Sequence, residues 1–331
     1  MITLVRRYAA LCALGTLTAV LAGCAGGTAA PGHPGHPARP TASPAAPSPP
    51  PAPPTLAPGP AGLTPVFTNG SRTQGRTVAL TFDADMTADQ GPRAAAGERF
   101  DNPALVATLR RLKVPATFFM TGRWAEEYPA QAKDIGRDPL FEVANHSYSH
   151  HAFTGSCYGL PNLPAARMRA DVERAFDAFR AAGVERPVPY FRFPGGCYDR
   201  QALRALAPGG VTAVQWDVVS GDAFATDSAA VAQQVLDGVR PGSVVVMHCT
   251  RSAAPATERA LRTIVPKLRE RGFRFVRVSE QIGSAAASSQ GVTGSQGVTG
   301  SPGAAASPGA AASPGAAASP AASKGAAAAR G

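Results

Sequence analysis

Acidic and aromatic residues are almost absent from the two ends of this sequence. None of the 22 aspartates and glutamates lies outside residues 67–283, and Tyr8 is the one aromatic residue beyond that stretch. Segments with so little apolar bulk cannot bury enough surface to offset the entropy lost on ordering. This excludes a single globule of 331 residues. It leaves one domain, residues 67–283, which is large enough to bury a substantial core.

The chain also lacks a basic run interleaved with aromatic residues, so we expect no nucleic-acid partner. Its formal net charge of +10 overstates the charge of the domain, because the two ends contain no acid. Residues 67–283 hold 27 of the 32 lysines and arginines, which leaves a domain charge of +5. A surface of this charge favours anionic wall polymers.

No comfortable membrane span is present near the N-terminus, because the apolar run Tyr8–Val20 is too short. The run follows two arginines and ends in Leu-Ala-Gly-Cys, so residues 1–24 resemble a bacterial lipoprotein signal peptide. Lipidation of Cys24 would tether the exported chain to the outer face of the cytoplasmic membrane, facing the cell wall. The alternative is an ordinary secretory signal in which Cys24 is incidental.

Low-complexity sequence flanks the domain on both sides. Residues 25–66 contain 14 prolines and predict a disordered linker, which would reach about 130 Å in the polyproline II limit. Residues 284–331 repeat every six residues, without the glycine period of collagen, and predict a flexible tail.

Cysteine is scarce. Beyond Cys12 in the signal segment and Cys24, the chain has only Cys157, Cys197 and Cys249. One disulfide with one thiol left over is possible, which suits an exported protein. Cys157 and Cys197 each precede a tyrosine in loop-like sequence, and we favour that pair; the sequence leaves the other pairings open.

Strand-like runs alternate with helical patterns through the domain, which predicts a parallel α/β fold. The predicted strands are residues 77–82, 116–120, 141–144, 190–193, 211–216, 243–247 and 273–278. Predicted helices lie near residues 102–113, 165–182, 228–239 and 257–271, the last kinked or shortened by Pro266. Periodicity does not separate an open sheet from a barrel, but both place active-site residues just past the C-terminal ends of strands.

Two pairs of polar residues follow predicted strands. His146 and His150 are four apart, a spacing typical of a two-histidine metal site but also of surface or core histidines. Asp83 and Asp85 can divide the work of metal ligand and general base, or they can form a turn or helix cap.

Three single residues also lie at strand ends. Arg192 stands between two phenylalanines, and a buried guanidinium there would need a partner. His248 ends a very apolar strand, either as a structural residue or as an acid above a pocket. Asp222 alone would pass for a turn residue.

In order, these segments resemble the five motifs of the polysaccharide deacetylase domain, carbohydrate esterase family four, over residues 76–282. The matching segments are Thr81-Phe82-Asp83-Ala84-Asp85, His146-Ser147-Tyr148-Ser149-His150, Arg192-Phe193-Pro194-Gly195-Gly196, Trp216 to Asp222, and Val246-Met247-His248. The resemblance implies a distorted (β/α) barrel of about seven strands, flanked by disordered tails.

The resemblance implies a divalent metal, usually zinc and sometimes cobalt or another ion, held by His146, His150 and an aspartate. The family's ligand position falls on Ala84, which cannot bind metal. Residues 83 and 85 point the same way on a strand, so we expect Asp85 to be the ligand. The alternatives are Asp83 itself, or a two-histidine site completed by water.

The other motif residues align with the acid–base chemistry of the family. Asp83 aligns with the base, and Arg192 would keep it ionised. His248 aligns with the acid, and Asp222 would hold its other ring nitrogen. The backbone N–H of Gly195 would stabilise the oxyanion. One departure is Ala223, which replaces a tryptophan of the fourth motif.

The sequence therefore predicts a metal-dependent N-deacetylase that acts on an N-acetylated glycan such as peptidoglycan. The competing hypotheses are an O-acetyl esterase, a hydrolase of non-sugar amides on the same fold, and a non-catalytic glycan-binding lipoprotein. The expected partners are the glycan and, through the lipid anchor, the membrane. We expect the protein to be a monomer.

Overall fold

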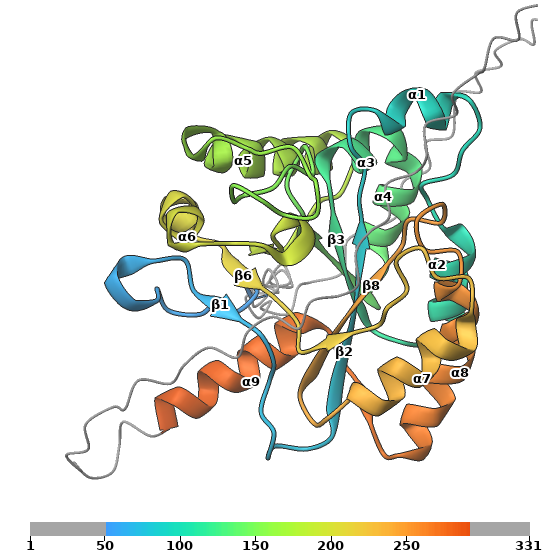
Figure 1. Cartoon of the computed structure of the whole chain (residues 1–331). Coiled ribbons are helices and arrows are strands. Elements are labelled where there is room, and N and C mark those ends of the chain that lie inside the picture. The colour runs from blue at the N-terminus through green and yellow to red at the C-terminus, as the bar shows by residue number, and fades with distance from the viewer. Residues whose placement is uncertain (1–50, 292–331) are drawn as a thin grey trace, which may run out of the picture. The chain divides into compact units, whose positions relative to one another are not determined.

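A computed structural model of the chain describes residues 51–291 (Figure 1). The predicted signal peptide, Cys24, the linker up to residue 50 and the repeats from residue 292 lie outside the described residues. None of the helices in the described part is long and apolar enough to cross a membrane.

Parallel strands form one sheet at the centre of the molecule (Figure 1). They are β1 Val66–Phe67, β2 Thr77–Ala84, β3 Ala116–Met120, β4 Phe141–Asn145, β5 Tyr190–Phe191, β6 Thr212–Val214, β7 Val218–Val219, β8 Ser243–His248 and β9 Arg274–Phe275. Their order is β1-β6-β5-β4-β3-β2-β8-β7, with β9 paired to β2. The sheet curls into a half-barrel, so the predicted distorted barrel is confirmed, with two more strands than expected.

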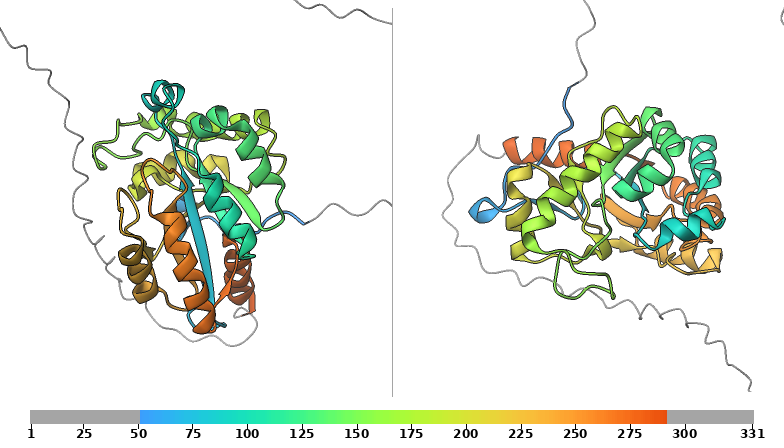
Figure 2. Two further views of the ribbon diagram at one scale, coloured as in Figure 1. Left: turned by 90° about the vertical axis from the view of Figure 1, so that its right-hand side faces the viewer. Right: turned by 90° about the horizontal axis from the view of Figure 1, so that it is seen from above.

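Helices cover the outside of the sheet (Figure 2). They are α1 Gln90–Ala95, α2 Pro103–Arg111, α3 Gly122–Glu127, α4 Pro129–Arg137, α5 Ala165–Ala181, α6 Arg200–Leu206, α7 Ser228–Gly238, α8 Thr257–Glu270 and α9 Val278–Gly291. On one flank α8 packs against α2 and α7, and on the other α5 packs against α3 and α6.

One helix differs from its prediction. Pro266 was expected to kink or shorten the helix near residues 257–271, yet α8 continues past it to Glu270. The helix buries Leu261, Ile264, Val265 and Leu268 on one stripe. This packing outweighs the loss of one backbone hydrogen bond at the proline.

The inside of the barrel is filled by small and apolar side chains from several strands, among them Ala79, Phe119, Ala144 and Val244. Helix α9 closes the N-terminal end of these strands with Val278 and Ile282. Its first turn is held by the buried Glu142 of β4, whose Oε1 accepts a hydrogen bond from the Ser279 N–H at 3.1 Å. The opposite end, where the strands finish, carries the predicted site.

The globular part begins earlier than the predicted boundary at residue 67. The Tyr190 hydroxyl donates to the Pro54 carbonyl at 2.7 Å, and the Leu56 N–H donates to Thr212 Oγ1 at 3.2 Å. Strand β1 also pairs with β6. The proline-rich composition predicts a spacer, but the end of that segment packs on the barrel through its carbonyl groups and Leu56.

Candidate active site

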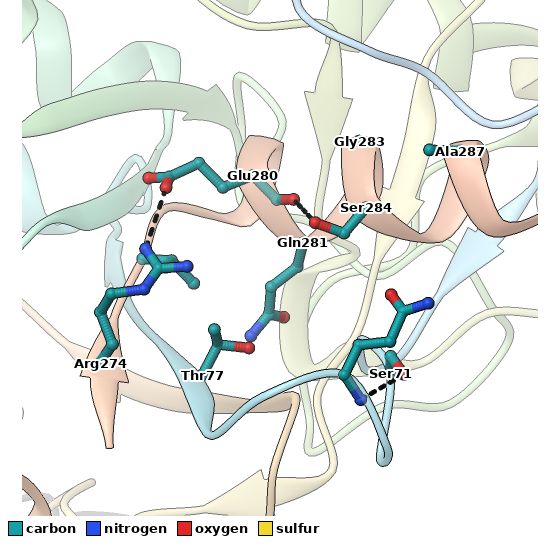
Figure 3. A pocket seen from close by; sticks show the side chains of 10 residues that line it. Ser71, Thr77, Arg274, Glu280, Gln281, Gly283, Ser284 and Ala287 are labelled. Atoms are coloured by element: carbon teal, nitrogen blue, oxygen red, sulfur yellow. Dashed lines mark hydrogen bonds and ion pairs between the residues drawn. The ribbon is translucent and has the colours of Figure 1, made fainter. Parts of the chain in front are cut away.

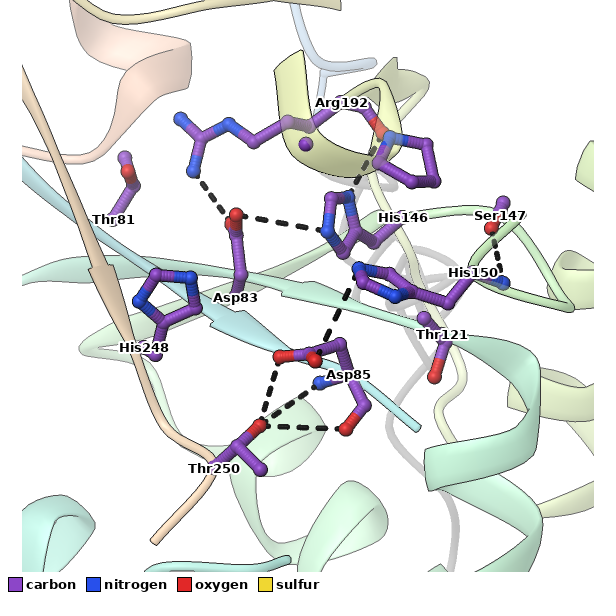
Figure 4. A network of polar contacts seen from close by, with 12 residues as sticks. Thr81, Asp83, Asp85, Thr121, His146, Ser147, His150, Arg192, His248 and Thr250 are labelled. Carbon is purple, nitrogen blue, oxygen red and sulfur yellow. Dashed lines mark hydrogen bonds and ion pairs between the residues drawn. The ribbon is translucent and has the colours of Figure 1, made fainter. Parts of the chain in front are cut away.

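The predicted polar residues meet at the C-terminal ends of the strands (Figure 4). Asp83 lies near the end of β2, and Asp85 directly follows that strand. The other predicted residues lie at the ends of further strands: His146 and His150 after β4, Arg192 after β5, Asp222 after β7, and His248 at the end of β8. Residues more than 150 positions apart in the sequence therefore form one cluster, because parallel strands finish at the same edge.

Asp83 and Arg192 form a buried ion pair at the centre of this cluster. Nη1 of Arg192 donates to Asp83 Oδ1 at 2.7 Å, and Nε donates to the Val214 carbonyl at 3.2 Å. Burial would raise the pKa of Asp83, but Arg192, with His146 and His248, outweighs burial and lowers it. Asp83 is therefore an ionised carboxylate, and Arg192 has the partner that the sequence required.

A backbone carbonyl fixes the ring of His146 and turns Nε2 toward Asp83. Its Nδ1 lies 2.9 Å from the Arg192 carbonyl oxygen. A carbonyl only accepts, so Nδ1 carries a proton and Nε2 is the ring nitrogen that faces the cluster. That Nε2 lies 3.6 Å from Asp83 Oδ2. A backbone carbonyl that fixes the ring in this way is typical of metal-binding histidines.

His150 and Asp85 form the second half of the cluster. His150 Nε2 lies 3.9 Å from Asp85 Oδ2, and the two histidine rings are 5.0 Å apart between centroids. Burial lowers the pKa of His150 to about 4, against the opposing effect of Asp85, so this ring is neutral at pH 7. Its Nδ1 is buried without a hydrogen-bond partner.

These donors fit a divalent metal in type, and two of their pairwise distances approach the spacing of metal ligands. Two ligands of a tetrahedral zinc, each about 2.1 Å from the ion, lie roughly 3.4 Å apart. The His146–Asp83 and His150–Asp85 separations of 3.6 and 3.9 Å are slightly wider. Within residues 51–291, however, no three His, Cys, Asp or Glu side chains converge on one point as a finished metal group. Binding would therefore draw the two pairs together.

The alternation of β2 explains how Asp85 reaches the histidines. Ala84 is fully buried in the core between sheet and helices, whereas Asp83 and Asp85 face the cluster. Asp85 Oδ1 accepts from Thr250 Oγ1 at 2.8 Å, which orients its other oxygen toward His150. The position that carries a ligand in the family motif thus points away from the site in this chain.

His248 and Asp222 form the opposite kind of pair. His248 Nδ1 lies 2.8 Å from Asp222 Oδ1, and the His248 backbone N–H donates to Oδ2 at 2.7 Å. Burial would lower the pKa of His248, but Asp222 outweighs burial and raises it to about 10. Because Asp222 holds Nδ1–H, the transferable proton of this imidazolium is on Nε2.

Strand register brings the two oppositely charged pairs together. Asp83 lies opposite His248 in the β2–β8 ladder, and the Cys249 N–H donates to the Asp83 carbonyl at 2.7 Å. A carboxylate and an imidazolium therefore lie side by side, next to His146 and His150.

Sequence analysis missed the groups that hold the loop between His146 and His150. Asp171 of α5 accepts the Tyr148 N–H at 2.7 Å and the Ser149 N–H at 3.3 Å on one oxygen. Ser147 and His150 have positive φ angles of 72° and 58°, a backbone conformation that residues other than glycine rarely adopt. Asp171 lies on the polar side of a long helix, and nothing in its local sequence signals this role.

Cys157 and Cys197 are joined in a disulfide, the favoured pairing, while Cys249 is free and buried. Gly195 lies beside the disulfide with a positive φ of 64°. A Cβ on this residue would lie 2.6 Å from Cys157 Sγ, so only glycine fits there. Its function as an oxyanion donor stays a prediction, and the exposed Ala223 provides no aromatic wall.

A cavity of about 520 Å³ lies at the other end of the barrel (Figure 3). Its lining includes Thr77 at the start of β2, Gln281, and the Arg274–Glu280 ion pair, whose closest atoms are 3.5 Å apart. The cavity contains none of the predicted catalytic residues.

The comparisons with known proteins agree with one another on the family. A family model described as "Polysaccharide deacetylase" matches residues 70–214. A chitooligosaccharide deacetylase of Sinorhizobium fredii is 32% identical over 202 residues, which cover 57% of this chain and 86% of the relative. A peptidoglycan-N-acetylglucosamine deacetylase of Bacillus cereus is 27% identical over 208 residues, which cover 62% of this chain and 87% of the relative.

Solved structures of the same fold include a pseudoenzyme. The wild-type protein from Bacillus anthracis, described as a CE4 family pseudoenzyme, is 24% identical and aligns with a TM-score of 0.55 over 69% of this chain and 70% of its own. A mutant described as having restored enzymatic activity is 25% identical. It aligns with a TM-score of 0.55 over 69% of this chain and 73% of its own.

Proposed function

Because this chain belongs to the polysaccharide deacetylase family, we propose that it is a metal-dependent hydrolase that removes N-acetyl groups from an extracellular glycan. Its relatives are described as deacetylases of chitooligosaccharides and of peptidoglycan N-acetylglucosamine. The proposed substrate is peptidoglycan or a similar N-acetylated polymer, the nearest candidate for an exported protein held at the wall.

One observation carries this proposal: neighbouring strands hold a base and an acid in opposite charge states. Asp83 has a lowered pKa and is ready to accept a proton, whereas His248 has a raised pKa and is ready to donate one. Hydrolysis of an amide needs both groups, because water must lose a proton and the leaving amine must gain one.

In the proposed mechanism Asp83 removes a proton from the attacking water, and Arg192 keeps its carboxylate ionised and oriented. The new C–O bond forms at the acetamide carbon, and the Gly195 N–H donates to the oxyanion. His248 Nε2–H then protonates the nitrogen as the C–N bond breaks, so acetate and a free amine leave.

A divalent ion, zinc or an alternative such as cobalt, would be held by His146, His150 and Asp85, and would polarise the carbonyl and acidify water. The support for this ligand set is the orientation of His146 Nε2 toward the cluster, the neutral ring of His150 and the position of Asp85 beside it. Asp85 would take over the function that Ala84 cannot perform.

The experiment that tests the activity is acetate release from N-acetylglucosamine oligomers and from peptidoglycan, with and without a chelator. The proposal expects release that a chelator abolishes and that zinc or cobalt restores. Folded protein that releases no acetate with any divalent ion would overturn it.

The second candidate is a non-catalytic glycan-binding protein. It is favoured by the buried Ala84 at the family's ligand position and by the likeness to a protein described as a pseudoenzyme. Metal analysis separates the two candidates: less than about one ion per chain after loading with zinc, together with glycan binding, would favour the second.

We also propose that Cys24 carries a lipid that anchors the enzyme at the outer face of the cytoplasmic membrane. The support is the Leu-Ala-Gly-Cys sequence after an apolar run. Labelling of expressing cells with an alkyne fatty acid tests this proposal. We expect label in the wild type and none in Cys24→Ala; equal labelling of both would contradict it.

A further inference from the structure

Large apolar side chains are exposed at one end of the barrel. Within residues 51–291, those that stand out from the surface are Tyr158 at 60%, Tyr198 at 38%, Val219 at 42% and Phe224 at 72% exposed. All four lie at or after the C-terminal ends of β4, β5 and β7, the end that carries the candidate active site. Single exposed apolar residues are ordinary, but a set gathered on one rim indicates a binding surface.

Tyr158 belongs to a short loop that directly follows the histidine motif, and Tyr198 belongs to the loop after β5. Residues 152–163, here called the lip, are closed at their base by hydrogen bonds from the Ala152 N–H to the Pro161 carbonyl and from the Leu163 N–H to the Ala152 carbonyl, both 2.8 Å. At its outer part, Cys157 is bonded to Cys197 in the loop after β5. The lip is therefore fixed at both ends.

The disulfide places a tyrosine on each side of the turn that follows Arg192. A Cβ on Gly195 would lie 3.1 Å from Tyr158 Cδ2, so the Tyr158 ring covers that part of the turn. The Tyr198 ring stacks on Phe193, with 5.1 Å between centroids and 17° between planes. Both rings thus lie against the turn that follows Arg192, and both remain open to solvent.

The Tyr158 backbone supports a functional reading of this loop. Its φ is +48°, a conformation that is unfavourable for a residue with a side chain and persists only where the surroundings impose it. The disulfide at the preceding residue is one such constraint. This exposed aromatic ring is therefore held in place at an energetic cost.

The two loop segments that carry these tyrosines contain no charged residue. Residues 152–163 and 193–198 have no Asp, Glu, Lys or Arg, and the exposed Asp199 and Arg200 follow at the start of α6. Exposed aromatic faces fit a neutral sugar ring, because the apolar face of a pyranose packs on an aromatic ring.

We propose that Tyr158 and Tyr198, held by the Cys157–Cys197 disulfide, bind the uncharged N-acetylated sugar next to the one that is deacetylated. This inference rests on the proposed function and deepens it, because it makes the substrate an oligomer or polymer instead of a single sugar. The lip then determines specificity for chain length.

The test measures acetate release by the full chain from N-acetylglucosamine oligomers of two to six units. We expect Tyr158→Ala and Tyr198→Ala to raise KM for the hexamer about five- to tenfold, with kcat within about twofold. The effect on the shortest oligomer that is turned over should be smaller than twofold. Tyr158→Phe and Tyr198→Phe are the matched controls, and they should stay close to the wild type because each keeps its ring.

The double variant Cys157→Ser/Cys197→Ser should show the same loss of hexamer affinity as the alanine variants while His146 and His150 still bind zinc. Equal KM values for wild type and alanine variants, or equal losses at every oligomer length, would overturn the proposal. If the wild type releases no acetate, the proposed function fails, and calorimetric binding of the hexamer by the same variants still decides the function of the lip.

Discussion

Asp83 and His248 lie opposite each other on adjacent strands, yet their local partners give them opposite charges. The buried guanidinium of Arg192 pairs with Asp83, and the buried carboxylate of Asp222 pairs with His248. Removing either group should leave the strands intact, because the β2–β8 ladder is formed by backbone atoms.

Asp83→Asn and His248→Ala should each lower kcat by about 10²- to 10⁴-fold, the range for loss of a positioned acid or base. The fold should persist, which circular dichroism and thermal unfolding would check. Near wild-type turnover in either variant would show that the residue is not the base or the acid.

The ionisation of His248 can be measured without substrate. In metal-free protein its pKa is about 10, against about 6.5 in an unfolded chain. Because folding favours the protonated form, its contribution to stability is complete below about pH 6.5 and is lost as pH rises toward 10. An NMR titration of the imidazole, with unfolding free energies across that window, measures both effects.

Asp222→Asn is the matched control for this titration. The largest of the effects that oppose burial would then be lost, so the pKa of His248 should fall from about 10, with Asp85 and Asp83 still raising it, and the stability advantage at neutral pH should shrink. An unchanged titration in this variant would contradict the assignment of Asp222.

Sequence alone located the residues that gather in the candidate site, because motif order and strand ends identify them. It did not locate the residues that hold them. Asp171, Thr250 and Thr257 act through hydrogen bonds from other elements; Thr257 Oγ1, for example, donates to Asp222 Oδ2 at 2.6 Å. No spacing or composition signals such contacts.

At the scale of elements, the loop between β4 and the lip depends on α5. Asp171 accepts two backbone N–H groups of the loop, and Asn145 Oδ1 accepts a third, from Ser147, at 2.8 Å. These bonds hold a segment with two strained positions, so their loss should release the histidines from their present geometry.

Asp171→Ala should weaken zinc binding about tenfold or more and lower the free energy of unfolding by about 1–3 kcal/mol, because buried N–H groups lose their acceptor. Asp171→Asn keeps an acceptor oxygen and should recover most of the zinc affinity. Competition with a zinc chelator measures the affinity. Equal zinc affinity in the alanine variant and the wild type would show that the loop is held without Asp171.

Strand and helix prediction succeeded where the pattern is long. The buried strands β2, β3 and β8 and the striped helices α5 and α8 have strong periodicity, and the sequence placed them within a few residues. The two-residue strands β1 and β7 are too short to show a period. Helix α9 runs into sequence whose repeats and small residues predict a tail, and its burial comes from the barrel that it closes.

At the scale of the whole molecule, alternation of elements predicted a parallel α/β fold and the family resemblance implied a barrel, but neither predicted its limits. The segment before β1 looks like a linker by composition, and its contacts with Tyr190 and Thr212 exist only once the barrel has formed.

A chain that begins at residue 67 should therefore unfold at least about 5 °C below one that begins at residue 51. The shorter chain loses the β1–β6 pairing and leaves the Tyr190 hydroxyl without the Pro54 carbonyl. Scanning calorimetry of the two chains makes the comparison, and equal unfolding temperatures would restore the boundary at residue 67.

The central claim is that this chain hydrolyses the acetamido groups of a glycan with a bound metal, Asp83 as the base and His248 as the acid. Titration of zinc into metal-free protein, with zinc bound per chain and acetate released followed in the same samples, tests it most directly. We predict that acetate release rises with bound zinc to a plateau near one ion per chain, and that Asp83→Asn binds the same zinc without releasing acetate. Stoichiometric zinc without acetate release in the wild type, or release that does not depend on zinc, would contradict the claim.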